Sequence, residues 1–172
     1  TLATNSVDSA ELIDGAVDTA HIAANQITSA IMPTGSVLQV VNVIYSSQTT
    51  INSNTWSSIG LAAAITPTSS SSKILATVYV TGIGSGSAQI NLRFRLVRGS
   101  TSIIQFENEA AYAAAFTSHL SVGATGCSYL DSPSTTSATT YTVQGQEYGG
   151  NATGYAQLTG SSSTITLMEI AG

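Results

Sequence analysis

Apolar and polar residues alternate along most of the chain after residue 35, with the period of two that is typical of β-strands. The clearest alternation lies at 88–98, where every second residue from Ile90 to Leu96 is apolar. The segment 36–45 also has adjacent apolar residues, which indicates a strand covered on both faces. The pattern predicts strands at 36–45, 56–65, 73–81, 88–98, 102–107, 110–117, 119–124, 139–147, 154–159 and 163–170.

Short strands separated by turns that contain Gly, Ser and Pro are typical of all-β architectures. No amphipathic helical pattern is longer than a turn or two, apart from an ambiguous alanine run at 110–115. The sequence therefore predicts a mainly β head domain at 35–172, an antiparallel β-sandwich of jelly-roll-like form. Trp56 is expected in its core, and the glycines of 82–86 are expected to form a flexible link.

The alternation also predicts the register of one hairpin. If Phe94 and Leu96 face the core, the next strand must turn Ile104 and Phe106 inward as well. Paired residue numbers must then sum to an even value, which a three-residue loop provides and a two-residue loop does not. The predicted loop is Gly99–Thr101, with Arg98 opposite Ser102 and Arg93 opposite Glu107.

Before residue 35 the pattern changes to tandem units of ten residues. Each unit has an apolar residue, a helix cap such as Asp8, a short helix-compatible run and a break such as Gly15. One helical turn is far shorter than the roughly 12–15 residues that are marginal alone in water. The apolar columns are Val7, Val17 and Ile27, then Ala10, Ala20 and Ala30, then Leu12, Ile22 and Met32.

These apolar side chains have nothing within their own unit to pack against, so they need copies of themselves. We therefore predict that residues 1–34 form a stalk in which identical chains wind about a common axis. The alternative is a solvated linker. Three copies of His21 could meet on that axis and bind an ion, although a solvent-facing histidine is favoured.

Charged residues make up only 8% of the sequence, and the net charge is −5. So few charges suit a protein that buries part of its surface in an assembly. The four basic residues leave no electrostatic footprint for nucleic acid. The single Cys127 excludes an intrachain disulfide and fits assembly in a reducing cytoplasm. No apolar run is long enough for a membrane span, and a start at Thr1 suggests the C-terminal piece of a longer protein.

The best candidate for ligand binding is a late loop that is rich in glycine and tyrosine. Tyr148, Asn151 and Tyr155 combine aromatic faces with an adaptable amide, as recognition loops do. Tyr112, with Phe116, is the second choice. The alternative is a plain hairpin whose tyrosines cover the sheet.

Two charged groups offer other chemistry. Arg93, Arg95 and Arg98 could form a basic strip for acidic polysaccharide groups, but pairing across the sheet with Glu107 is the favoured interpretation. Glu107 and Glu109 lie about 7 Å apart along one strand face, a spacing that can serve glycoside hydrolysis. The sequence places no third acidic group nearby and contains no catalytic motif. We predict no catalytic residues, no metal ligands and no cofactor.

Several motifs resemble one family. The repeat units, the junction at 32–41 and the segments 60–67, 71–75, 94–98, 129–133 and 165–170 are similar to the C-terminal region of tailed-phage tail fibres. The resemblance is notably to the fibres of marine cyanophages and pelagiphages. Such fibres are trimeric, and their ends recognise the host surface. The resemblance touches most of the chain, except 107–126 and 145–160.

This resemblance implies a virion protein, assembled in the host cytoplasm, that joins an upstream fibre segment. Its head would attach the virion to a host-cell-surface receptor, a glycan or a protein, without catalysis or membrane insertion. The alternatives are a glycan-degrading spike and a purely structural fibre or knob.

Overall fold

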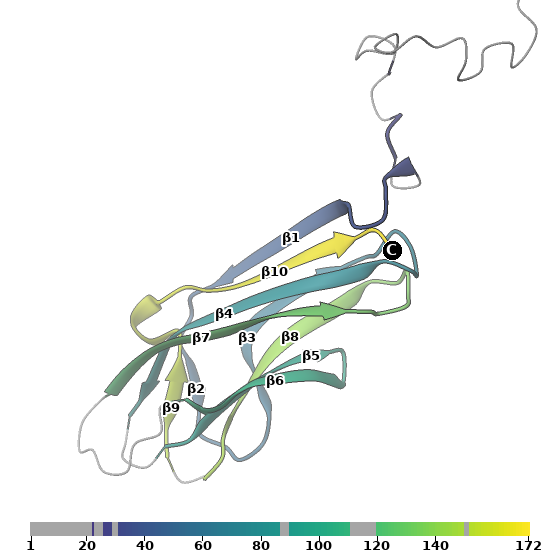
Figure 1. Ribbon diagram of the computed structural model, residues 1–172. Coiled ribbons are helices and arrows are strands. Elements are labelled where there is room, and N and C mark those ends of the chain that lie inside the picture. Colours follow the sequence, from purple (N-terminus) through teal and green to yellow (C-terminus); the bar gives the residue numbers. More distant parts are fainter. Residues whose placement is uncertain (1–21, 23–25, 29–30, 87–89, 111–119, 150–151) are drawn as a thin grey trace, which may run out of the picture. The chain divides into compact units, whose positions relative to one another are not determined.

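The computed structural model describes residues 22, 26–28, 31–86, 90–110, 120–149 and 152–172. Contacts divide the chain into two units, Thr1–Pro33 and Thr34–Gly172. In the second unit, antiparallel strands form two sheets that pack as a β-sandwich (Figure 1). The predicted mainly β fold is confirmed. Most of the ten-residue units, with His21, lie outside the described residues, so the stalk and its oligomeric state stay predictions.

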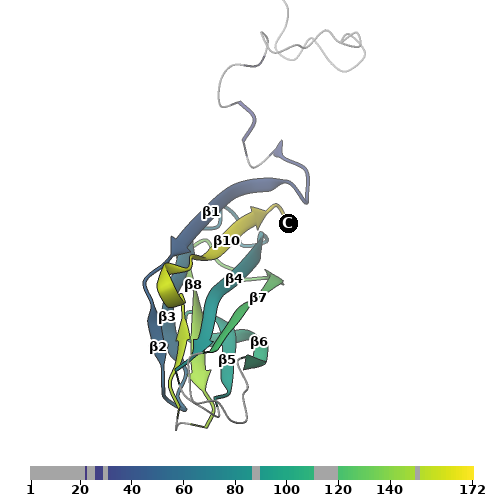
Figure 2. The ribbon, with the colours of Figure 1, turned by 90° about the vertical axis from the view of Figure 1, so that its left-hand side faces the viewer.

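Sheet A has the strand order β1-β10-β4-β9-β2, and β7 also pairs with β4. Its strands are β1 (Val37–Tyr45), β2 (Thr49–Ile51), β4 (Lys73–Ser85), β7 (Leu120–Asp131), β9 (Gly154–Ala156) and β10 (Ser163–Ile170). Figure 2 shows β1 and β10 running side by side, and a 3-10 turn, Leu158–Gly160, precedes β10.

Sheet B has the order β3-β8-β5-β6. Its strands are β3 (Ser57–Ile65), β5 (Leu92–Arg98), β6 (Thr101–Ala110) and β8 (Thr139–Glu147). The core between the two sheets is formed by the apolar side chains of alternate positions on each strand. Its largest fully buried members include Phe94, Leu92, Leu96, Tyr141, Ile74, Ile165 and Leu167.

The predicted strands differ from the observed ones mainly around glycines. The segment 82–86 was expected to be a flexible link, but β4 runs through it to Ser85. Gly82 has φ 59°, and a Cβ there would lie 2.5 Å from the backbone nitrogen of Leu158. The glycine therefore forms an irregularity within the strand, against which the 3-10 turn packs. The strand predicted at 110–117 lies almost wholly outside the described residues.

The predicted three-residue hairpin loop is wrong. Arg98 pairs with Thr101, so only Gly99 and Ser100 form the loop, with Gly99 at φ 54°. A two-residue loop alone would turn the apolar residues of β6 outward. A register shift corrects this, because beyond it Leu96 pairs with Ile104 on the core side.

A second register shift separates Glu107 from its predicted partner. Glu107 pairs with Phe94 instead of Arg93. The hydroxyl of Thr125, on β7 of sheet A, donates a hydrogen bond to Glu107 Oε2 at 3.1 Å. The carboxylate therefore links the two sheets at their β6–β7 edge and does not form the predicted pair with Arg93.

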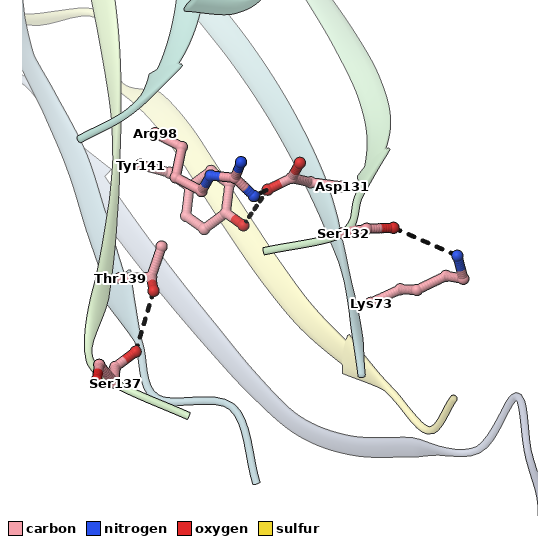
Figure 3. A network of polar contacts seen from close by, with 7 residues as sticks. All are labelled: Lys73, Arg98, Asp131, Ser132, Ser137, Thr139 and Tyr141. Carbon is pink, nitrogen blue, oxygen red and sulfur yellow. Dashed lines mark hydrogen bonds and ion pairs between the residues drawn. The ribbon is translucent and has the colours of Figure 1, made fainter. Parts of the chain in front are cut away.

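A buried polar network links the sheets at another place (Figure 3). Asp131 Oδ2, at the end of β7, accepts hydrogen bonds from Arg98 Nη1 and from the Tyr141 hydroxyl, each 2.7 Å long. Burial, reinforced by the hydrogen bond and negative charge of Asp131, raises the pKa of Tyr141 above its usual range. Arg98 therefore points into the sandwich and is not part of a surface strip with the other arginines.

A second buried carboxylate, Glu169, fixes the loop after β3. Its oxygens accept hydrogen bonds from Gln39 Nε2 and from the backbone and hydroxyl of Thr68. Burial acts to raise the pKa of Glu169, but these hydrogen bonds to the charged form outweigh it, so the pKa lies below its usual range. The charge is accommodated because its acceptor positions are filled.

We expect Asp131→Ala to reduce the free energy of unfolding by about 2–4 kcal/mol, because it leaves the Arg98 and Tyr141 donors without their acceptor. Lys73→Ala is the control. It removes an exposed hydrogen bond to Ser132 and should cost less than about 0.5 kcal/mol. Urea denaturation measures both. Equal costs would mean that the network does not hold the sheets together.

Candidate ligand-binding face

The two tyrosines of the predicted loop do not lie on one surface. Tyr148 follows β8 of sheet B, whereas Tyr155 lies on β9 of sheet A between the inward-facing Gly154 and Ala156. The two tyrosines therefore belong to opposite outer faces of the sandwich. Asn151, Tyr112 and Phe116 lie outside the described residues.

Tyr148 instead belongs to a site with Arg93. Its backbone N–H donates to Asn91 O at 2.9 Å, which holds the ring beside β5. The guanidinium carbon of Arg93 lies 3.3 Å from the centroid of the Tyr148 ring. Arg93 Nε also donates to Asn108 O at 3.2 Å, so a stack and a hydrogen bond fix the orientation of the guanidinium.

Arg95 repeats this arrangement two residues further along the strand. Its guanidinium carbon lies 4.4 Å from the centroid of the Trp56 ring, and its Nε donates to Gln144 Oε1 at 2.9 Å. Trp56 is therefore half-buried beneath an arginine on the outside of sheet B, and its expected place in the core is wrong.

The neighbouring turn is tied to the sheet, which keeps Trp56 in place. Gln146 Nε2 donates to both the backbone oxygen and Oδ1 of Asn54, each at 2.9 Å. The backbone N–H of Glu147 donates to Ser53 O at 3.0 Å. The indole is thus presented by a fixed turn rather than by a free loop.

We call the surface formed by Trp56, Arg93, Arg95, Gln144 and Tyr148 the arginine face. Stacking uses the flat side of a guanidinium and leaves its N–H edge available in the plane. With Nε engaged, the terminal Nη groups of Arg93 and Arg95 have no hydrogen-bond or ion-pair partner among the described residues. The face can therefore offer two oriented, cationic donor pairs beside two aromatic rings.

A shallow depression of about 500 Å³ adjoins this face; the described residues Gln105, Phe106, Glu107 and Asn108 line it. Gln105 pairs with Arg95 across the β5–β6 ladder, and Asn108 accepts the Arg93 hydrogen bond. Gln105 Nε2 donates to Asn108 Oδ1 at 2.7 Å, so the depression offers the remaining N–H and C=O groups of these two amides next to the cationic donors.

The carboxylates at this edge serve the backbone. Glu107 Oε1 accepts hydrogen bonds from the backbone N–H groups of Asn108 and Glu109, at 2.9 and 3.1 Å. With Thr125 on Oε2, both oxygens of Glu107 are engaged, while Glu109 is exposed. In the described parts of the chain, no group of three or more His, Cys, Asp or Glu residues could hold a metal ion.

No protein-family model matches this sequence, and comparison with curated proteins finds no match. The resemblance to tail fibres therefore rests on the sequence motifs alone. Across the described residues, no helix has the length and apolar character needed to cross a membrane.

The sequence pattern indicates the two arginines but not their aromatic partners. The period of two placed Arg93 and Arg95 on one side of a strand. Trp56 and Tyr148 come from other elements, 39 residues before and 55 residues after the arginine that each one meets. Only the pairing of β3, β8 and β5 brings them together.

We expect Trp56→Ala to lower the free energy of unfolding by less than about 2 kcal/mol, because the indole packs on the outside of sheet B. Phe94→Ala, which truncates a fully buried ring, should cost about 3–5 kcal/mol. Urea denaturation of the two variants provides the comparison. Similar costs would place Trp56 in the core after all.

Proposed function

We propose that this chain is the tip of a phage tail fibre that attaches the virion to an acidic glycan of the host cell surface. The observation that carries the proposal is the arginine face, where Arg93 and Arg95 are oriented but have no carboxylate partner among the described residues. The sequence motifs supply the phage context.

The chemistry of the face suits a sugar acid. A terminal guanidinium edge can donate two parallel hydrogen bonds to a carboxylate or sulfate. Tyr148 is 51% exposed, so part of its ring can pack against the apolar side of a sugar. The side chains of Gln105 and Gln144 supply amide groups for hydroxyls. None of these contacts requires a covalent bond of the glycan to be cleaved.

A glycan-degrading spike is the main competing function, and the geometry favours attachment. Hydrolysis would need Glu107 and Glu109 as an acid–base or nucleophilic pair. Both oxygens of Glu107 instead accept hydrogen bonds from the protein, two of them from the backbone of β6. The carboxylate acts as a structural acceptor in this position.

The proposed assembly is a homotrimer joined to an upstream fibre segment of the virion. Support for copies of the chain comes from the ten-residue units, whose apolar columns need partners, and from the low charge content of 8%. A purely structural knob would have no use for two oriented guanidinium groups on an outer face that have no carboxylate partner among the described residues.

We expect Arg93→Gln, Arg95→Gln and Tyr148→Ala each to weaken binding to an acidic polysaccharide by about tenfold, the loss of one charge-assisted or stacking contact. Affinity electrophoresis of the full chain in gels containing polygalacturonate measures this loss, and gels containing dextran provide the neutral comparison.

Lys73→Gln is the matched control, because it removes a positive charge from the other sheet. It should leave the polygalacturonate affinity unchanged. Equal losses for Lys73→Gln and Arg93→Gln would reduce the binding to general charge attraction. Equal retardation by dextran and polygalacturonate would contradict an acidic ligand.

A further inference from the structure

The outer face of sheet A is apolar where an exposed sheet face is normally polar. One row of paired residues crosses β1, β10, β4 and β7 with apolar side chains throughout: Val40, Met168, Leu75 and Leu130. Val40 is 55% exposed and Leu130 51% exposed. The same side of the sheet also carries Ile44 and Tyr79, which are 62% and 53% exposed.

Four polar residues of this face are paired with one another in two hydrogen bonds. They form the next row, in which Asn42 Nδ2 donates to Thr166 Oγ1 at 2.7 Å. Further along that row, the hydroxyls of Thr77 and Ser128 share a hydrogen bond of 3.1 Å. Covering the row would therefore leave few polar atoms without partners, which reduces the usual cost of burying them.

The lack of charge on this face indicates that copies of this chain pack against it. Of the described side chains that project from this part of sheet A, only Lys73 at its margin is charged. The chain as a whole carries a net charge of −5, and contact through an uncharged surface avoids placing like charges of two copies next to each other. The opposite side of the sandwich carries Arg93 and Arg95 and is the polar one. The neutral face is the one through which copies can approach.

The segment before β1 also indicates that copies of this chain are the partner. Ile22, Ile27 and Ile31, described residues of the segment before β1, are 41%, 58% and 61% exposed. They belong to the ten-residue units, whose apolar columns cannot be buried within one chain. Exposed apolar side chains thus continue along the sequence from the repeats into β1.

We propose that the outer face of sheet A, from Val40 across to Leu130, is the surface through which three copies of this chain pack around a common axis. Strand spacing makes three copies fit. Four strands span about 15–19 Å, so three such faces closing a triangle lie about 4–5.5 Å from its centre. Facing sheets pack about 10 Å apart, or about 5 Å from their midplane. Side chains of ordinary size would fill the interior.

This inference rests on the proposed assembly of copies but not on glycan binding. The test uses Val40→Glu and Leu130→Glu, single variants at the two margins of the row. Both side chains are exposed in one chain, so each substitution should be tolerated by the fold, which circular dichroism checks. Tyr148→Glu places the same charge on the arginine face and is the control.

Two measurements are made on the full chain at micromolar concentration. Sedimentation gives the mass of the assembly. Peroxide oxidation of Met168, followed by peptide mass spectrometry, reports on the centre of the row, because an accessible methionine is converted to its sulfoxide. We expect a trimer with slow oxidation for the original chain and for Tyr148→Glu. Val40→Glu and Leu130→Glu should oxidise at Met168 several-fold faster, with or without loss of mass.

The outcomes separate the two claims. A monomeric original chain would overturn both the assembly and the interface. A trimer in which Met168 oxidises equally fast in the original chain and both glutamate variants would retain the assembly and overturn this interface. Faster oxidation at an unchanged trimer mass would support the interface and show that the repeats hold the chains together by themselves.

Discussion

The packing of two antiparallel sheets against each other is the constraint on which the rest of the molecule depends. Phe94 and Tyr141 of sheet B meet the aliphatic side chains of sheet A in a core that excludes water. Each strand therefore places every second side chain in the interior, and the alternate side chains face outward. The Arg98–Asp131–Tyr141 network and Glu107 link the same two sheets through buried or half-buried polar groups.

The outward-facing side chains differ in character between the two sheets. On sheet B they are arginines, glutamines and two aromatic rings, in an arrangement that orients cationic donors outward. On sheet A they are aliphatic side chains around an internally hydrogen-bonded polar row. A polar face for a ligand and an apolar face for copies would allow one small domain both to assemble and to attach, because the two surfaces lie on opposite sides of the core.

Alternation predicted the mainly β fold and most strands, since burial of one face imposes a period of two. It could not predict the hairpin loop, because register shifts inside the ladder restore the inward side of Ile104 after a two-residue turn. Nor could alternation predict long-range contacts. Arg98 turns inward to Asp131, and Trp56 lies outside the core under Arg95. The apolar neighbours in 36–45 did predict a second cover for β1. Within one chain, Val40 and Ile44 of that strand remain exposed.

Hydroxyl-radical footprinting of the full chain is the most direct test that sheet A mediates assembly and the arginine face binds the glycan. Tyr79 on sheet A and Tyr148 on the arginine face are matched probes, because they are 53% and 51% exposed in a single chain. We expect Tyr79 to be protected in the assembly while Tyr148 reacts, and polygalacturonate then to protect Tyr148 without changing Tyr79. Equal reactivity of the two tyrosines in the assembly, or protection of Tyr148 before glycan is added, would contradict this assignment of the two faces.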